Sequence, residues 1–76
     1  MTRQDLALIV ATRAALADGS AKARRIEARV RQVEMARRLG RGQPTVSQWE
    51  NGLRVPAADD ALAYGKALAA LAKLAA

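Results

Sequence analysis

Two short helical patterns joined by a glycine-containing turn place the strongest constraint on the fold of this chain. They cover residues 32–39 and 43–51. Two helices that meet at a steep angle through a short turn need a small residue in the first helix, a glycine in the turn and an apolar anchor in the second. Ala36, Gly40 and Val46 supply these in order. The segment therefore predicts a packed helix pair, either a helix-turn-helix or a plain helical hairpin in a structural bundle.

Capping signals divide the N-terminal part of the chain into two further helices. Thr2 and Asp5 have the spacing of a capping box, with Asp in place of the usual Glu or Gln. Gly19 suits the left-handed position that follows a helix, so the first helix is expected to end just before it. Ser20 is then available as the N-cap of a second helix over about residues 21–29.

The second helix and the last helix show different apolar patterns. Ile26 and Val30 are the clearest apolar contacts of the second helix. Pro56 marks the start of a long helix over residues 57–76, which carries a broad stripe of Leu and Ala. Gly65 within that helix is expected to mark close packing against another helix.

The composition favours an all-α fold. The apolar residues are almost entirely Ala, Leu and Val, with no Phe, one Tyr and one Trp among 76 residues, which suits short, closely packed helices. We expect one compact domain of five helices. Its expected parts are an N-terminal helix in residues 1–19, a core in residues 20–56 and a C-terminal helix in residues 57–76.

The residue types that most catalysis requires are missing. The chain contains no cysteine and no histidine, and its seven carboxylates form no recognisable paired motif. A thiolate metal site is therefore excluded, and most metal, nucleophilic and general-base chemistry has no obvious agent. We expect a protein that is not an enzyme and has neither a cofactor nor a metal site.

The positive charge is concentrated in one part of the chain. Residues 22–54 contain nine basic and three acidic side chains, which account for the whole net charge of +6. A positive field confined to the segment of the helix pair is typical of phosphate contact. The alternative is a solvated basic face that only maintains solubility.

No segment resembles a membrane span or a signal peptide. The longest apolar run covers residues 6–11, far below the roughly 20 residues that a bilayer requires. Asp5 precedes this run and Arg13 follows it closely, which does not fit a secretory signal. We expect a cytoplasmic protein.

The second helix of the pair has one polar and one apolar face. Side chains at positions i, i+1, i+4 and i+5 lie on the same side of a helix, and a helix in the DNA major groove needs such a set facing the base edges. Val46 and Trp49 lie on the opposite side and are expected in the core. The four polar-face positions are Gln43, Pro44, Ser47 and Gln48.

Over about residues 20–68 the chain resembles the helix-turn-helix heads of phage repressors and Cro proteins, also called the xenobiotic-response-element or Cro/C1 type. The matching residues are Gln32, Ala36, Leu39, Gly40, Gln43, Thr45-Val46-Ser47, Trp49-Glu50-Asn51-Gly52 and Pro56. The resemblance implies a lambda-repressor-like five-helix bundle in which the helix at Gln43 enters the major groove. The N-terminal helix is additional to that pattern, and the last two helices are fused into one.

The resemblance also implies roles for individual residues. Base contacts are assigned to Gln43, Pro44, Ser47 and Gln48, and phosphate contacts to Arg31, Gln32, Arg41, Thr45, Asn51 and Arg54. Glutamine can pair with adenine through two hydrogen bonds, and a proline ring can contact a thymine methyl group. Gln32 is further expected to brace Gln43. Arg25 and Glu50 match positions that form a structural ion pair.

Two positions depart from the pattern of similar heads. Arg31 and Gly42 stand where those heads usually have a Ser or Thr N-cap. Helix capping is therefore expected to be weaker, by up to about 1 kcal/mol at Arg31 and by only tenths at Gly42.

These observations predict a sequence-specific DNA-binding transcription regulator, acting as a repressor on a palindromic operator in a double-stranded promoter. The biological settings left open are a phage or mobile element, a restriction-system controller, and an antitoxin that also binds a toxin. A non-DNA helical interaction module is a further alternative. A homodimer is expected because one small head reads few base pairs. The candidate dimer contacts, which could instead pack within the chain, are Leu6, Ile9, Val10, Leu68, Leu71 and Leu74.

Overall fold

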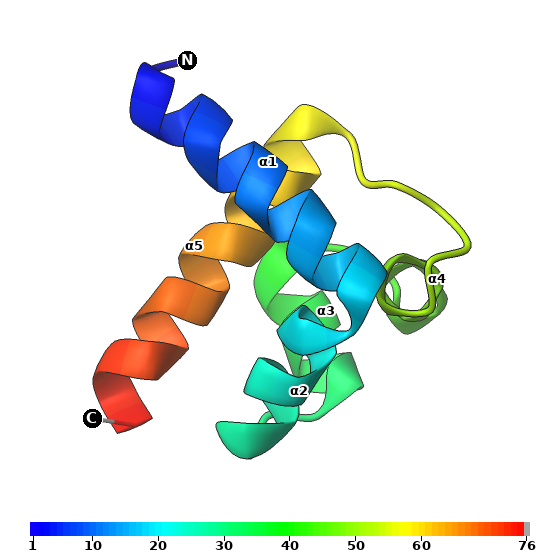
Figure 1. Ribbon diagram of the computed structural model, residues 1–76. Helices are drawn as coiled ribbons and strands as arrows, with labels where there is room; N and C mark the ends of the chain where they lie inside the picture. Colours follow the sequence, from blue (N-terminus) through cyan, green and yellow to red (C-terminus); the bar gives the residue numbers. More distant parts are fainter. Residues whose placement is uncertain (76) are drawn as a thin grey trace.

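The computed structural model describes residues 1–75 and contains five α-helices and no strand over that part of the chain (Figure 1). The helices are α1 Arg3–Asp18, α2 Ser20–Glu27, α3 Gln32–Leu39, α4 Gln43–Glu50 and α5 Ala58–Ala75. The all-α prediction is confirmed, and the helix ends differ from the predicted ones by one or two residues. None of the described helices is both long and apolar enough to cross a membrane.

The N-terminal capping box of α1 is present as predicted. Thr2 Oγ1 accepts a hydrogen bond from the Asp5 backbone N–H at 3.0 Å, and Asp5 Oδ2 accepts one from the Thr2 N–H at 3.2 Å. The helix ends at Gly19, whose φ of +86° lies in the left-handed region. Residues other than glycine rarely adopt that conformation, so Gly19 allows the sharp change of direction into α2.

Three predictions for α2 were wrong. Ser20 is the first helical residue rather than the N-cap, because Gly19 holds the N-cap position and Asp18 Oδ1 accepts from the Ser20 N–H at 2.8 Å. The helix ends at Glu27, and Arg29 then has a φ of +64°. Ile26 is 52% exposed, because the inward face of α2 is formed by Ala21 and Arg25. A residue adjacent to Arg25 is turned about 100° away from that face.

The core draws on all five helices. Trp49 belongs to it as predicted, and Tyr64, Met35 and Val46 are its largest completely buried side chains. Val30 packs against its edge, as expected. The clustered buried residues are Leu16, Ala21, Met35, Ala36, Val46, Trp49, Tyr64, Ala67 and Leu68.

Two of the candidate dimer contacts are buried within the chain. Ile9 is 2% exposed and Leu68 is 3% exposed. A side chain that is already covered by its own chain has no surface to offer a partner. For these two residues the alternative of intramolecular packing is correct, because both side chains are buried within the chain. Leu71 is partly buried against the core.

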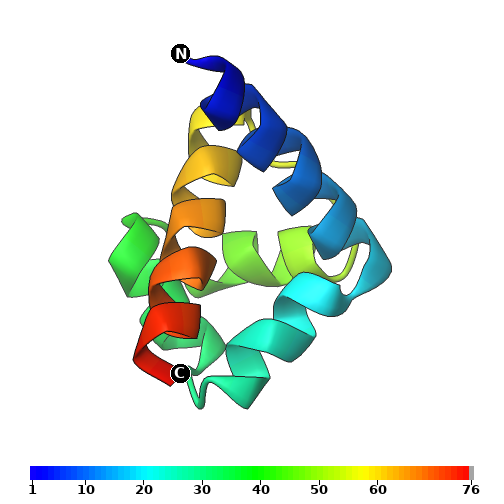
Figure 2. The same ribbon diagram turned by 60° about the vertical axis from the view of Figure 1, so that its left-hand side comes forward.

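The long helices α1 and α5 cross at close range (Figures 1 and 2). A Cβ atom added to Gly65 would lie 2.9 Å from Leu8 Cγ and would also collide with Thr12 Oγ1. The prediction that Gly65 marks close helix packing is confirmed. Arg13 adds a polar link, since its Nε and Nη2 donate to the Pro56 carbonyl at 3.1 and 3.0 Å. The helix α1 thereby holds both α5 and the segment that precedes it.

Candidate nucleic-acid interface

The helices α3 and α4 form a pair joined by a three-residue turn. Gly40 has a φ of +67°, and the Arg41 N–H donates to the Ala36 carbonyl at 2.9 Å, which closes the end of α3. Ala36 and Val46 are both buried. The small residue, the turn glycine and the apolar anchor therefore take the positions that a helix-turn-helix requires.

The helix α4 has one buried and one exposed face. Val46 and Trp49 point into the core, whereas Gln43, Pro44 and Gln48 are exposed and Ser47 is half-exposed. Figure 1 looks almost along the axis of α4, which lies at one edge of the bundle. The four predicted base-contact residues are thus available to a ligand on one side of a rigidly packed helix.

A buried ion pair fixes the end of α4 to α2. Arg25 Nε donates to Glu50 Oε2 and Arg25 Nη2 donates to Glu50 Oε1, both at 2.8 Å. The two side chains are 6% and 0% exposed. Arg25 Nη1 also donates to the Val30 carbonyl at 2.8 Å. The pair suggested by the sequence is present, and its two-pronged geometry gives α4 a fixed orientation relative to α2.

Two further side chains bind the same carboxylate. The Tyr64 hydroxyl donates to Glu50 Oε2 at 2.6 Å, and Gln32 Nε2 donates to Glu50 Oε1 at 3.0 Å. The role of Tyr64 was missed from the sequence. A signal was available, because the only tyrosine of the chain lies one turn before Leu68 on the apolar stripe of α5. A buried tyrosine hydroxyl needs a hydrogen-bond partner.

The contacts of Glu50 determine which groups in this cluster carry charge. Burial alone would raise the pKa of Glu50, but hydrogen bonds from Arg25, Tyr64 and Gln32 outweigh it and hold the pKa below its ordinary value. Burial, together with the adjacent carboxylate, raises the pKa of Tyr64 well above its ordinary value. At neutral pH Glu50 is therefore ionised, whereas Tyr64 keeps its proton and donates it.

Gln32 connects this buried cluster to the exposed face of α4. Gln43 Nε2 donates to Gln32 Oε1, so the predicted bracing of Gln43 is confirmed. Both ends of the Gln32 amide are bonded within the protein. A phosphate contact by Gln32, if made, would use its backbone N–H in the first turn of α3.

Two of the predicted phosphate-contact arginines are paired with carboxylates. Arg31 lies 3.3 Å from Glu34, and its side chain is largely exposed. Arg41 Nε donates to Asp60 Oδ1 at 2.9 Å, a contact with the first turn of α5 that the sequence did not suggest. Exposed pairs of this kind are weak, so both guanidinium groups can exchange a carboxylate for a phosphate.

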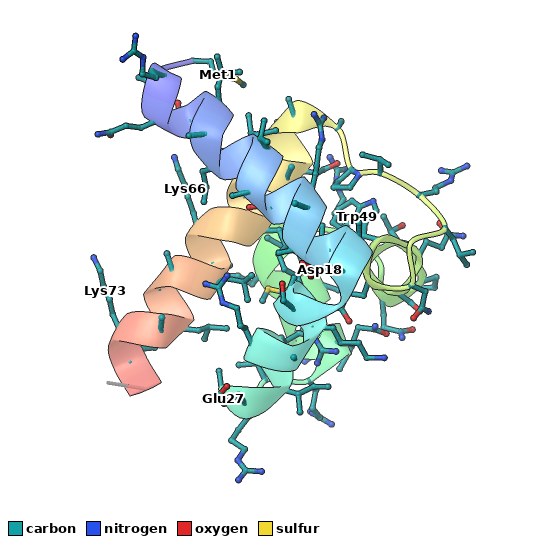
Figure 3. All side chains as sticks on the ribbon, in the orientation of Figure 1. Met1, Asp18, Glu27, Trp49, Lys66 and Lys73 are labelled. Atoms are coloured by element: carbon teal, nitrogen blue, oxygen red, sulfur yellow. The ribbon has the colours of Figure 1, made fainter. Side chains whose placement is uncertain are left out.

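The remaining predicted phosphate-contact residues lie around the same face. Asn51 and Arg54 are exposed just beyond the end of α4, and Thr45 is half-exposed within it. Asn51 Nδ2 donates to Ser47 Oγ at 3.2 Å. By contrast, Lys66 and Lys73 project from the part of α5 that is turned away from α4 (Figure 3). The basic residues of the helix pair are therefore separate from those of α5.

The weaker helix caps predicted for α3 and α4 are also present. Neither Arg31 nor Gly42 caps its helix through a side-chain oxygen. In α3 Glu34 compensates in part, because its Oε1 accepts from the Arg31 N–H at 2.8 Å. In α4 Pro44 lies in the first turn, where the missing N–H has no cost.

The comparison with protein families agrees with this geometry. A family model described as "Helix-turn-helix domain" matches residues 21–76. The chain belongs to the helix-turn-helix domain family and is a DNA-binding protein of that class. The helix α1 lies outside the matched residues. No curated protein and no solved structure matches the chain.

Proposed function

We propose that this protein is a sequence-specific transcription regulator of the phage-repressor and Cro type, and that it represses by occupying a promoter. The observation that carries the proposal is the exposed set Gln43, Pro44 and Gln48 on a helix whose opposite face is buried. Specific readout needs side chains held within a narrow range of positions. The Arg25–Glu50 ion pair provides that rigidity at the end of α4.

In this proposal α4 enters the major groove and the surrounding basic residues contact phosphate. Gln43 and Gln48 read base edges, and the Pro44 ring contacts an apolar base group. Arg31, Arg41 and Arg54 position the protein on the backbone. These phosphate contacts release counterions from the DNA, so the affinity of the protein for DNA falls steeply as the salt concentration rises. The protein needs no catalytic group or cofactor for this activity.

Two copies are proposed to bind a palindromic operator. Leu6 and Val10 on α1, and Leu74 near the end of α5, remain exposed among the candidate dimer contacts. Sedimentation velocity with and without operator DNA tests the pairing, together with the variants Val10→Lys and Leu74→Lys. A monomer mass at every concentration, with DNA present, would contradict a dimer.

The test of specific readout is fluorescence anisotropy on the duplex upstream of the protein's own gene and on a scrambled duplex, across a salt series. We expect a preference of about 10³-fold or more for the upstream duplex. Gln48→Ala should abolish most of it, whereas the control Gln4→Ala, an exposed glutamine on α1, should not. Equal binding to both duplexes would mean that the protein binds DNA only through its basic surface, without reading the sequence, and would reject the proposal.

A second candidate function is that of an antitoxin, which binds a toxin as well as its own promoter. It is favoured by a hollow of about 120 Å³ between α3 and α5, lined by Met35, Leu71 and the exposed Leu74 among others. Co-expression with the product of the neighbouring gene tests it. A stable complex that Ala70→Lys, a change in the lining of this hollow, disrupts without loss of DNA binding would support this function.

A further inference from the structure

The helices α2, α3 and α4 end in the same hydrogen-bonding motif. At the end of α2 the Arg29 N–H donates to the Ile26 carbonyl at 2.9 Å. The Val30 N–H donates to the Arg25 carbonyl at 3.2 Å. These two bonds define the Schellman motif, in which the residue after the C-cap adopts a left-handed conformation. Arg29 holds that position, with a φ of +64°.

The same motif at the ends of α3 and α4 contains glycine. Gly40 has a φ of +67°, and its N–H donates to the Arg37 carbonyl at 3.2 Å. Gly52 has a φ of +72°, and its N–H donates to the Trp49 carbonyl at 3.2 Å. In residues other than glycine this conformation brings Cβ too close to the following carbonyl oxygen. Of the three equivalent positions, the one after α2 therefore carries backbone strain.

The side chain of Arg29 does not offset this strain within the protein. It is exposed, and within residues 1–75 it forms neither an ion pair nor a side-chain hydrogen bond. Its charge adds to the excess of nine basic over three acidic residues in the segment 22–54, and such an excess disfavours the compact state. Strained residues tend to occur where they contact a ligand. An exposed cation in a positive segment fits an anionic one.

Arg29 also lies next to a residue of the candidate nucleic-acid interface. It stands two positions before Arg31, so the two Cα atoms are at most about 7 Å apart. A DNA strand presents one phosphate for about every 3.4 Å of helix axis. Two arginines at this separation can therefore bind neighbouring phosphates of one strand.

We propose that Arg29 is a further phosphate-contact residue, and that its charge strengthens DNA binding while its backbone conformation lowers the stability of the fold. This inference rests on the proposed function, since it assumes that this face of the protein binds DNA. A phosphate contact carries no sequence information, so Arg29 contributes to affinity and not to specificity.

The experiment measures thermal stability and DNA affinity on the same set of variants. Arg29→Gly removes both the strain and the charge, Arg29→Gln removes the charge but keeps the strain, and Arg29→Lys keeps both. Lys66→Gln on α5, at an exposed position turned away from α4 (Figure 3), is the control for the loss of one positive charge. Circular dichroism gives the melting temperature. Fluorescence anisotropy on the upstream and scrambled duplexes, across a salt series, gives the affinity and its salt slope.

We expect Arg29→Gly to raise the melting temperature by roughly 4–8 °C, the shift for relief of one left-handed non-glycine residue in a domain of this size. The same variant should bind both duplexes roughly 5- to 10-fold more weakly at about 0.1 M salt, with a salt slope smaller by about one. Arg29→Gln should show the same loss of affinity without the gain in stability. Arg29→Lys should stay close to wild type in both measurements, and Lys66→Gln should keep the wild-type affinity.

Four results would overturn the inference. If Arg29→Gly gains stability but keeps the wild-type affinity, Arg29 does not contact DNA, while the proposed function stands. If Arg29→Gly loses affinity and Arg29→Gln does not, the loss comes from a changed backbone rather than from the missing charge. If Lys66→Gln loses as much affinity as Arg29→Gln, only the net charge of the protein matters. If the wild-type protein binds neither duplex, the proposed function fails together with the inference.

Discussion

At the scale of single residues, the Arg25–Glu50 pair makes the clearest prediction for stability. Both side chains are almost completely buried, and removal of one partner leaves an uncompensated buried charge. Arg25→Ala is therefore expected to lower the free energy of unfolding by about 3–5 kcal/mol. Urea denaturation followed by circular dichroism measures this. The control is Arg24→Ala, an exposed neighbour on α2, which should change little. An unfolding midpoint equal to wild type in Arg25→Ala would refute the structural role of the pair.

The hydrogen bond from Tyr64 to Glu50 makes stability depend on pH. The pKa of Glu50 is lowered in the folded state, so its stabilisation is present above the unfolded pKa of about 4.5. That stabilisation is lost as pH falls through the lower pKa of the folded state. Tyr64→Phe leaves one acceptor site of Glu50 unpaired and should cost about 1–3 kcal/mol at pH 7.

The difference between wild type and Tyr64→Phe should shrink as the pH falls from 6 to 2, because protonation of Glu50 weakens the bond. Urea denaturation at each pH tests this. The other carboxylates titrate in both proteins alike, so their contribution cancels in the difference. A difference that stays constant over the whole range would mean that the hydroxyl does not interact with an ionised carboxylate.

Much of the site could be predicted from residue types at fixed spacing. Arg25 with Glu50, and Gln32 with Gln43, belong to a continuous pattern that spans α2 to α4, and the structure places both pairs in contact. Contacts from α5 were not predictable in the same way. Tyr64 reaches Glu50, and Asp60 reaches Arg41, only because of the angle at which α5 packs across the helix pair. No local pattern encodes that angle.

At the scale of helices, the crossing of α1 and α5 depends on Gly65. Replacing glycine by alanine within a helix normally stabilises by about 1 kcal/mol. At Gly65 the added methyl group would lie 2.9 Å from Leu8 Cγ and against Thr12, and overpacking costs about 1–3 kcal/mol. We expect a net loss of up to about 2 kcal/mol in a thermal or urea melt. The control is Ala69→Gly at an exposed position of α5. It should also destabilise the protein, but only because glycine has a lower helix propensity than alanine. If Gly65→Ala were more stable than the wild type, the α1–α5 crossing could accommodate an additional methyl group.

The link between the turn after α3 and the start of α5 should influence DNA binding. Asp60 holds the Arg41 guanidinium at 2.9 Å, and this contact competes with a phosphate for the same group. Asp60→Asn is expected to strengthen DNA binding, because Arg41 then contacts a phosphate without first giving up its ion pair with Asp60. Asp59→Asn, an exposed neighbour, removes the same charge without the contact and is the matched control. Identical titration curves for both variants would exclude a specific effect of the pair.

Helix type was easier to predict than helix boundaries. The ends of α1 and α3 follow from glycines at positive φ, which the sequence marks directly. The end of α2 does not, because Arg29 adopts a positive φ without being glycine. The prediction of the inward face of α2 was also wrong. A simple amphipathic pattern assumes an apolar residue there, whereas the buried residue is Arg25. The second error comes from the Arg25–Glu50 ion pair, which tertiary contacts define.

At the scale of the whole molecule, α1 is packed as part of the same core although it lies outside the residues that match the helix-turn-helix domain. Two of its side chains, Ile9 and Leu16, are buried in the molecule. Its Arg13 also donates a hydrogen bond to the carbonyl of Pro56, just before α5. A chain that begins at Gly19 would leave the Gly65 face of α5 exposed to water. It would also lose the buried Ile9 and Leu16 from the core of a domain of only 76 residues, which has little stability to spare.

Deletion of residues 1–18 is therefore expected to abolish cooperative thermal unfolding and, with it, the proposed sequence-specific DNA binding. Circular dichroism melts and anisotropy titrations measure the two effects. The variant Arg13→Ala removes only the link to Pro56 and should keep a cooperative transition at a lower temperature. If the shortened chain still melts cooperatively and binds with the wild-type preference, α1 is an accessory helix, and residues 19–76 are sufficient for folding and DNA recognition.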